Sequence, residues 1–266
     1  MTFIANKVSN ERVAQELNQI LVSPSPSIGL NLMMETGVMS EIMPEFCPMV
    51  GMEQSFPHHK PVWGHTLQVV EQIDNTLICR MAGLMHDVGK PATKSVDGNI
   101  VHFYQHEYVG ARIAYDILKR LRYSNEFVDS VCKLVSLHMR PNFYEVNWTD
   151  TSVRRLMRDA GDLLPDLLAL SKADITSQRK AKVQARIRVI EHLTNRCEGI
   201  TLSDSITGFE VKSPINGNEL MEYFGKPAGK WITEVKSFLI ERVMANELQF
   251  DDKDAAFEMA KEFLEV

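Results

Sequence analysis

The sequence has 266 residues, 44% of them hydrophobic, with a formal net charge of −6 and four cysteines. A chain of this length can bury a core without disulfides, and no apolar run approaches the roughly 20 residues that a membrane span requires. The negative net charge is unlike that of a dedicated nucleic-acid binder, although it is compatible with a local basic patch. There is no signal-peptide pattern at the N-terminus and the cysteines are far apart, so we expect a cytoplasmic protein with free thiols.

Hydrophobic residues recur at helical spacing along most of the chain, which predicts an all-α protein. The first helix begins behind Ser9, has Leu17 and Leu21 on its apolar face, and ends at the stretch SPSPS. Further helices are expected over 28–34, 62–75, 77–88, 106–121, 125–139, 151–160, 163–179 and 180–196.

Two stretches depart from the helical pattern. In KSVDGNIVHFY (94–104), Asp97 and Gly98 lie between two short β-prone runs, which predicts one small β-hairpin. The stretch SDSITGFEVKSPINGNEL (203–220) is polar and rich in turn residues, and two or three short helices are expected to follow it.

The stretch AGLMHDVGKPATKS places His86 and Asp87 at the end of an otherwise apolar helix. Gly89 and Pro91 follow directly and should stop that helix. A carboxylate at the end of a buried run is costly unless a positive charge meets it. The motif therefore raises the question of which positive charge lies beside Asp87.

Four other polar side chains fall on the apolar stripes of their predicted helices: His65, His106, His138 and Asp174. A single histidine in such a position is most often a hydrogen-bonded core residue. Five helix segments each carry a polar side chain on their apolar face, and chance is a poor explanation for this agreement. Imidazoles and carboxylates gathered in one core would be unstable without cations. We interpret the set as metal ligands.

Three further histidine positions have simpler interpretations. His58 and His59 lie in a loop bounded by prolines and are expected to be exposed, with the rim of a pocket as the alternative. His102 alternates with Val101 in the hairpin and should face outward. His192 is alone on a late helix, where a structural role is expected.

The order His65, His86-Asp87, Asp174 resembles the HD-domain superfamily of metal-dependent phosphohydrolases, with HDVGKP similar to its signature stretch. His106 and His138 match the extended form of that motif, which binds two metals. The segments ETGVMSEIMPEF, HTLQVV, FYQHEYVGARIAYDILKRLR, LMRDAGDLLPDLLALSKADI and INGNELMEYFGKPAGKWI are similar to the C-terminal HD region of bacterial CCA-adding tRNA nucleotidyltransferases.

The catalytic head of those enzymes has no counterpart in this sequence. The resemblance therefore implies a free-standing HD phosphohydrolase domain over residues 1–200, N-terminal helices included. Residues 201–266 would form a C-terminal helical extension. A protein of this organisation is not expected to add CCA.

The resemblance also implies a two-metal site in which the oxygens of Asp87 bridge both ions. The implied ligands are His65, His86 and Asp174 on one ion, His106 and His138 on the other, and Asp87 on both. Mixed histidine and carboxylate ligands favour Mn, Fe, Co, Ni or Zn over Mg alone, and the sequence does not decide among them. The ions would clamp a phosphoryl group and lower the pKa of a bridging water, so that hydroxide attacks phosphorus.

Phosphate recognition requires further positive charge. Lys90 follows the HD pair and is expected in the pocket, Arg140 lies two residues past His138, and Arg112 is a third candidate that could equally form a structural ion pair. Glu107 is expected to support His106 rather than to transfer protons. The basic stretch RKAKVQARIR (179–188) is either a solvated helix face or a contact to a phosphate backbone.

The function expected from these features is hydrolysis of nucleotide phosphomonoesters or 2′,3′-cyclic phosphates by Asp87, Lys90 and the metals. One alternative is a non-catalytic RNA- or protein-binding remnant of a tRNA nucleotidyltransferase, which would have no reason to retain six buried polar ligands. A nucleoside triphosphate triphosphohydrolase is another, and it would need a larger basic pocket. A small phosphate ester is the expected partner, with weak RNA contact open and the oligomeric state undetermined.

Overall fold

The computed structural model describes residues 8–54, 60–98, 100–177, 179–207, 212–245 and 247–265. By its internal contacts the chain divides into two compact units. The first comprises residues 1–146 and 160–194, and the second comprises residues 147–159 and 195–266. The assignment of residues 1–200 to a phosphohydrolase domain stays a prediction.

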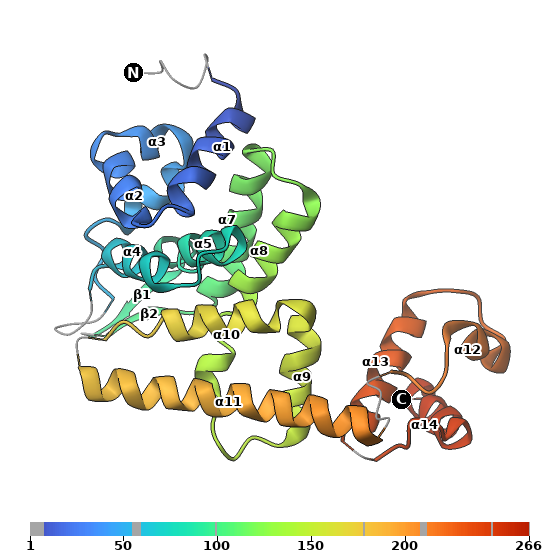
Figure 1. The fold of residues 1–266 in the computed structure, drawn as a ribbon. Coiled ribbons are helices and arrows are strands. Elements are labelled where there is room, and N and C mark those ends of the chain that lie inside the picture. The colour runs from blue at the N-terminus through green and yellow to red at the C-terminus, as the bar shows by residue number, and fades with distance from the viewer. Residues whose placement is uncertain are drawn as a thin grey trace. The chain divides into compact units, whose positions relative to one another are not determined.

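The first unit is helical, as the sequence predicts (Figure 1). Ser9 caps its first helix by accepting a hydrogen bond from the Arg12 backbone N–H at 3.3 Å. Its helices are α1 (Asn10–Leu21), α2 (Pro26–Glu35), α3 (Val38–Ile42), α4 (Val62–Gln72), α5 (Leu77–Met85), α6 (Lys90–Thr93), α7 (His106–Arg120), α8 (Asn125–Leu137) and α10 (Leu164–Ala173), with 3₁₀ turns η1 (Pro44–Met49), η2 (Pro141–Phe143) and η3 (Gly161–Leu163).

Helix α5 runs through the centre of this unit, and every residue from Cys79 to Met85 is buried. It packs against α4, α8 and α10 (Figure 1), and its apolar side chains belong to a core shared with α4 and α8. The turn after α5 approaches α7 very closely at Gly89, where an added Cβ would lie 2.2 Å from the His106 carbonyl oxygen and 2.5 Å from the Gly110 nitrogen. Glycine is required there because no other residue would allow this approach.

The predicted hairpin is present as β1 (Lys94–Asp97) and β2 (Ile100–Phe103). The strands are antiparallel, with Lys94 opposite Phe103 and Asp97 opposite Ile100. Gly98 in the turn has φ 58°, a left-handed conformation that glycine adopts without strain. The hairpin leads directly into α7 and to the polar residues described below.

Two predicted helix ends differ most from the structure. The helix expected over 163–179 ends at Ala173, so Asp174 is its C-cap rather than an interior residue. The helix expected over 180–196 continues as α11 (Lys180–Thr207) into the polar stretch predicted to be turn-rich. Within the extension, Cys197 and Ile200 are buried, and the Asp204 carboxylate accepts two hydrogen bonds from the Arg154 guanidinium, at 2.6 and 3.2 Å.

The second unit has its own apolar core. Its elements include α9 (Asp150–Ala160), α12 (Gly217–Phe224), α13 (Lys230–Met244) and α14 (Lys253–Glu265), with the C-terminal part of α11. Asn216 and Glu219 form a capping box at the start of α12. The buried core residues are Ile215, Leu220, Val235, Leu239, Val243, Leu248, Ala256 and Ala260.

All four cysteines, Cys47, Cys79, Cys132 and Cys197, are free thiols. Burial raises the pKa of the Cys79 thiol to about 12, and of Cys132 and Cys197 to about 11. These thiols are therefore unreactive core residues. Within the described ranges, no helix has the length and apolarity needed to cross a membrane.

Candidate metal centre

The side chains that the sequence predicts as ligands come together at helix ends in the first unit. His86, His138 and Asp174 are the C-caps of α5, α8 and α10, and His106 is the first residue of α7. His65 projects from within α4. The C-terminal end of a helix carries partial negative charge, so three such ends at one site favour a cation there.

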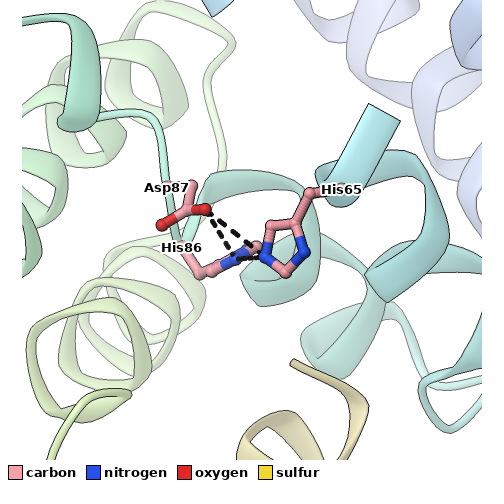
Figure 2. A group of neighbouring side chains, drawn as sticks. All are labelled: His65, His86 and Asp87. Carbon is pink, nitrogen blue, oxygen red and sulfur yellow. Dashed lines mark hydrogen bonds and ion pairs between the residues drawn. The ribbon is translucent and has the colours of Figure 1, made fainter. Parts of the chain in front are cut away.

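The first ligand group comprises His65, His86, Asp87 and Asp174. Figure 2 shows how the first three face one another, with the two imidazole Nε2 atoms 3.2 Å apart. Asp87 Oδ2 lies 3.2 Å from His86 Nε2 and 3.5 Å from His65 Nε2. Asp174 Oδ1 lies 2.9 Å from His65 Nε2 and 3.6 Å from His86 Nε2. Four ligand atoms from three parts of the chain thus surround one point.

The second ligand group comprises Asp87, His106 and His138. The Nε2 atoms of the two histidines are 3.3 Å apart, and Asp87 Oδ1 lies 3.5 Å from His106 Nε2. Asp87 therefore directs one carboxylate oxygen to each ligand group. All three residues are buried, with at most 6% of their surface exposed.

Backbone hydrogen bonds fix the imidazole tautomers. The Nδ1 atoms of His86, His106 and His138 lie 2.8, 2.8 and 2.7 Å from carbonyl oxygens three residues earlier in the chain. A carbonyl oxygen only accepts, so each Nδ1 carries the proton that it donates. The neutral form of each ring then presents an Nε2 lone pair to the cluster, which is the orientation a metal ligand requires.

The second ligand group is left with an unsatisfied pair of acceptors. Burial lowers the pKa of His138 to about 4 and also lowers the pKa of His106, so both rings are neutral near pH 7. Their Nε2 lone pairs then face each other at 3.3 Å with no proton between them. A divalent cation bound by both nitrogens and Asp87 removes this conflict, so the residues present fit a metal ion.

The first ligand group holds a proton instead. Burial alone would lower the pKa of His86, but the charge of Asp87 and hydrogen bonds to Asp174 and Asp87 outweigh it and raise the pKa to about 10. Burial opposes the ionised form of both carboxyl groups, but the charges of His86 and Lys90 hold the pKa of Asp87 well below its usual range, and hydrogen bonds from His65 and His86 do the same for the pKa of Asp174. The charged imidazole of His86 thus neutralises the carboxylates where a metal would otherwise do so.

Other side chains orient the ligands. Lys90 Nζ donates to Asp87 Oδ2 and to Gln54 Oε1, both at 2.6 Å. Asn142 Nδ2 donates to Asp174 Oδ2 at 3.1 Å, and Thr176 Oγ1 lies 2.7 Å from His65 Nδ1. Asn142 and Thr176 thus leave Asp174 Oδ1 and His65 Nε2 facing the cluster, whereas Lys90 shares Asp87 Oδ2 with the first ligand group.

The cluster lies in a cleft of about 630 Å³. The basic residues that line it are Lys60, Lys90 and Arg186, and the last also donates to the Asn142 carbonyl oxygen. Arg112 and Arg140 are not among its lining residues, and Arg112 is exposed on α7.

Sequence reasoning missed Lys60 and treated Arg186 only as part of a basic stretch. No local pattern distinguishes Arg186 from its basic neighbours on α11, because its position depends on how α11 packs.

The other histidines have different outcomes. His102 lines the cleft, so the expectation that it faces outward is wrong. The stacking of its ring on Tyr104 holds it there. His192 has the structural role expected, with Nδ1 2.8 Å from the Tyr144 hydroxyl. His58 and His59 lie outside the described residues.

A helical unit with buried His/Asp groups at converging helix ends belongs to the class of domains that can hold metal ions in their core. Residues 58–179 match the family described as HD domain, and this part of the chain is an HD domain. Residues 4–49 match a second family, described as the probable RNA and SrmB-binding site of polymerase A.

Curated relatives of the chain are tRNA nucleotidyltransferases. A CC-adding tRNA nucleotidyltransferase of Thermus thermophilus is 32% identical over 240 residues, which are 88% of this chain and 52% of the relative. An A-adding tRNA nucleotidyltransferase of Deinococcus radiodurans is 34% identical over 176 residues, 64% of this chain and 40% of the relative. A multifunctional CCA protein of Actinobacillus pleuropneumoniae is 29% identical over 137 residues, 48% and 33% of the two chains. The chain thus spans about half, or less, of the relatives it matches.

Proposed function

We propose that the protein is a metal-dependent phosphohydrolase that acts on nucleotides, either phosphomonoesters or 2′,3′-cyclic phosphates. One divalent transition metal ion would be held by His65, His86 and Asp174, a second by His106 and His138, and both by Asp87. The observation that carries this proposal is the geometry of Asp87, whose two oxygens face different pairs of imidazole nitrogens.

The bound ions would polarise the phosphoryl group and activate a water molecule for attack. The chain's own residues prepare the cleft for that reaction. Lys90 places its ammonium group beside Asp87 and in the cleft, where it can bind a phosphate oxygen. The Glu107 carboxylate lines the same cleft and lies 3.6 Å from His106 Nδ1, so it supports that ring.

The relatives support a substrate of nucleotide chemistry, since they are named for adding nucleotides to tRNA. A triphosphohydrolase is the less favoured candidate. Among the described residues, three with basic side chains, Lys60, Lys90 and Arg186, line the cleft, and neither Arg112 nor Arg140 adds to them. A reaction on small cellular nucleotides agrees with a cytoplasmic location, which we include in the proposal.

RNA contact is a second candidate, favoured by the match of residues 4–49 to a probable RNA-binding family. That segment contains two basic and five acidic residues, so phosphate contacts from it would be few. We therefore place RNA contact second, as a weak activity or as the retained property of a non-catalytic remnant.

The test is hydrolysis of a nucleotide panel by protein that has been stripped of metal and reloaded with Mn, Fe, Co, Ni or Zn, with the products separated by chromatography. A phosphomonoester would yield a nucleoside and phosphate, and a 2′,3′-cyclic phosphate would yield a nucleoside 2′- or 3′-phosphate. We expect turnover of at least one 2′-, 3′- or cyclic nucleotide in the reloaded protein and none in the stripped protein. If no ester is hydrolysed with any metal, while a gel-shift shows tRNA binding that is independent of metal, the non-catalytic RNA-binding function replaces the proposal.

A further inference from the structure

Two exposed aromatic side chains line the cleft beyond the ligand groups. Tyr104 follows strand β2 and is 70% exposed, and Phe143 ends the η2 turn and is 64% exposed. Both belong to the lining of the cleft that holds Asp87. Aromatic surface kept open inside a cleft gains free energy when a flat ligand covers it.

The ring of Tyr104 is held in place from one side. The His102 ring stacks on it with centroids 4.9 Å apart and an angle of 11° between the planes. One face of Tyr104 is therefore covered by His102, while its 70% exposure leaves the other side open to a ligand. The next residue, Gln105, has φ 60°, an uncommon conformation for a residue other than glycine, and it too lines the cleft.

Phe143 is fixed by its neighbour. Tyr144 is only 2% exposed, and its hydroxyl lies 2.8 Å from His192 Nδ1. The η2 turn is thus anchored by Tyr144, while Phe143 remains open to the cleft. Segments far apart in sequence, after β2 and after α8, each contribute one aromatic ring.

Positive charge lines the same cleft. Lys90 lies beside the ligand groups, and Lys60 and Arg186 are further basic lining residues. An occupant that satisfies both features has a flat aromatic part joined to a phosphate. Stacking on aromatic side chains together with cationic contacts to phosphate is how proteins bind nucleotide bases without reading their edges.

We infer that Tyr104, assisted by Phe143, stacks on the nucleobase of the substrate and so determines that the cleft accepts nucleotides rather than phosphate esters in general. The inference rests on the proposed function, because it places the phosphate at Lys90 and the ligand groups. The nucleobase could belong to a free nucleotide or to the end of a nucleic-acid strand, and both present the same ring to Tyr104.

The test is calorimetric binding to metal-stripped protein, with AMP and with ribose 5-phosphate, which lacks the base. We expect Tyr104→Ala to weaken AMP binding about tenfold and to leave ribose 5-phosphate binding unchanged. Tyr104→Phe should retain the affinity for AMP. Tyr108→Ala is the matched control, because Tyr108 is 61% exposed on α7 and is not among the residues lining the cleft.

The inference is overturned if Tyr104→Ala lowers the affinity for AMP and for ribose 5-phosphate equally, or if it leaves the affinity for AMP unchanged. AMP binding that depends on Tyr104 without hydrolysis of any nucleotide would reject the proposed function alone. A dinucleotide with a terminal phosphate separates the two sources of the base. If the dinucleotide binds more tightly than AMP, and Lys60→Ala removes this difference, the base belongs to a strand end. If the dinucleotide and AMP bind with equal affinity, the base belongs to a free nucleotide.

Discussion

The two ligand groups share Asp87 but differ in how they are neutralised. In the first group, two carboxylates flank His86 and raise its pKa to about 10, so a proton can occupy the position of a metal. In the second group, burial lowers the pKa of His138 to about 4, and two neutral nitrogens face each other. The first group therefore binds metal in competition with a proton. The second group has no such proton, and only a bound metal ion satisfies its two nitrogens.

This difference follows from where the carboxylates lie. Asp174 is the C-cap of α10, and its Oδ1 lies near the Nε2 atoms of His65 and His86. The second group receives a single carboxylate oxygen, from Asp87. The count of carboxylates at each group, rather than the number of histidines, decides which group keeps a proton when metal is removed.

The largest effect is expected for Asp87→Asn, which retains the shape of the side chain and removes the charge shared by both groups. We expect loss of both metal ions and a fall in hydrolysis of about a thousandfold, because metal-ion stabilisation supplies several kcal/mol to such reactions. Elemental analysis and initial rates check it. Asp97→Asn in the exposed hairpin is the control. Asp87→Asn protein with both ions and most of its activity would show that Asp87 does not bridge them.

The next largest effect is a difference in stability between variants of the two ligand groups, measured in metal-stripped protein. Removing His86 takes one cation away from the buried Asp87 and the half-buried Asp174 and leaves Lys90 beside Asp87, so His86→Ala should destabilise the fold by about 3–5 kcal/mol. His138 is neutral there, and His138→Ala should cost less, about 1–3 kcal/mol. Denaturant unfolding of both variants in chelator measures the difference. Equal destabilisation, or a larger loss in His138→Ala, would remove the asymmetry on which the comparison rests.

Much of this site could be predicted from sequence, because its ligands interrupt apolar helical stripes. The spacing of His65, His106 and His138 with apolar neighbours indicates that each faces the core, and the structure brings them together. The hairpin at Asp97-Gly98 was predictable for a local reason, since Gly98 supplies the left-handed turn. Features of this kind depend on neighbouring residues in the sequence and can be predicted without knowledge of the fold.

What the sequence did not predict depends on tertiary contacts. Helix α10 ends at Ala173 although its pattern continues, and this makes Asp174 a C-cap whose carboxylate Asn142 holds. Helix α11 continues to Thr207, and within this part Asp204 pairs with Arg154, 50 residues away in the chain. The placement of Arg186 in the cleft has the same origin, since it depends on packing and not on local pattern.

A smaller effect is expected for Asn142→Ala. Its amide donates to Asp174 Oδ2, on the side of the carboxylate away from the ligand atom Oδ1. Loss of such a supporting hydrogen bond typically lowers metal affinity about 10- to 100-fold, and only the first group should be affected. Metal titration with a competing chelator should therefore show that one ion binds with lower affinity and the other with unchanged affinity. Equal weakening of both ions would contradict the assignment of Asp174 to the first group alone.

The smallest effect is a change in the pH dependence of stability. Because the pKa of His86 is raised, its stabilisation of stripped protein is full below the usual histidine pKa of 6.5 and is lost as pH rises toward about 10. Metal binding displaces that proton, so metal stabilises more as pH rises. Between about pH 7 and about pH 9, the Tm of stripped protein should fall relative to His86→Ala, and the stabilisation by metal should grow. A stripped protein whose Tm rises relative to His86→Ala would contradict the pKa of His86.

Anomalous diffraction from crystals of cobalt-loaded protein tests the central claim most directly. We expect two metal peaks about 3.5–4 Å apart, each about 2.0–2.2 Å from its ligand nitrogens, with Asp87 Oδ2 bound to the ion at His86 and Asp87 Oδ1 to the ion at His138. A single peak in the cluster, or two peaks that Asp87 does not join, would contradict a two-metal centre built around this carboxylate.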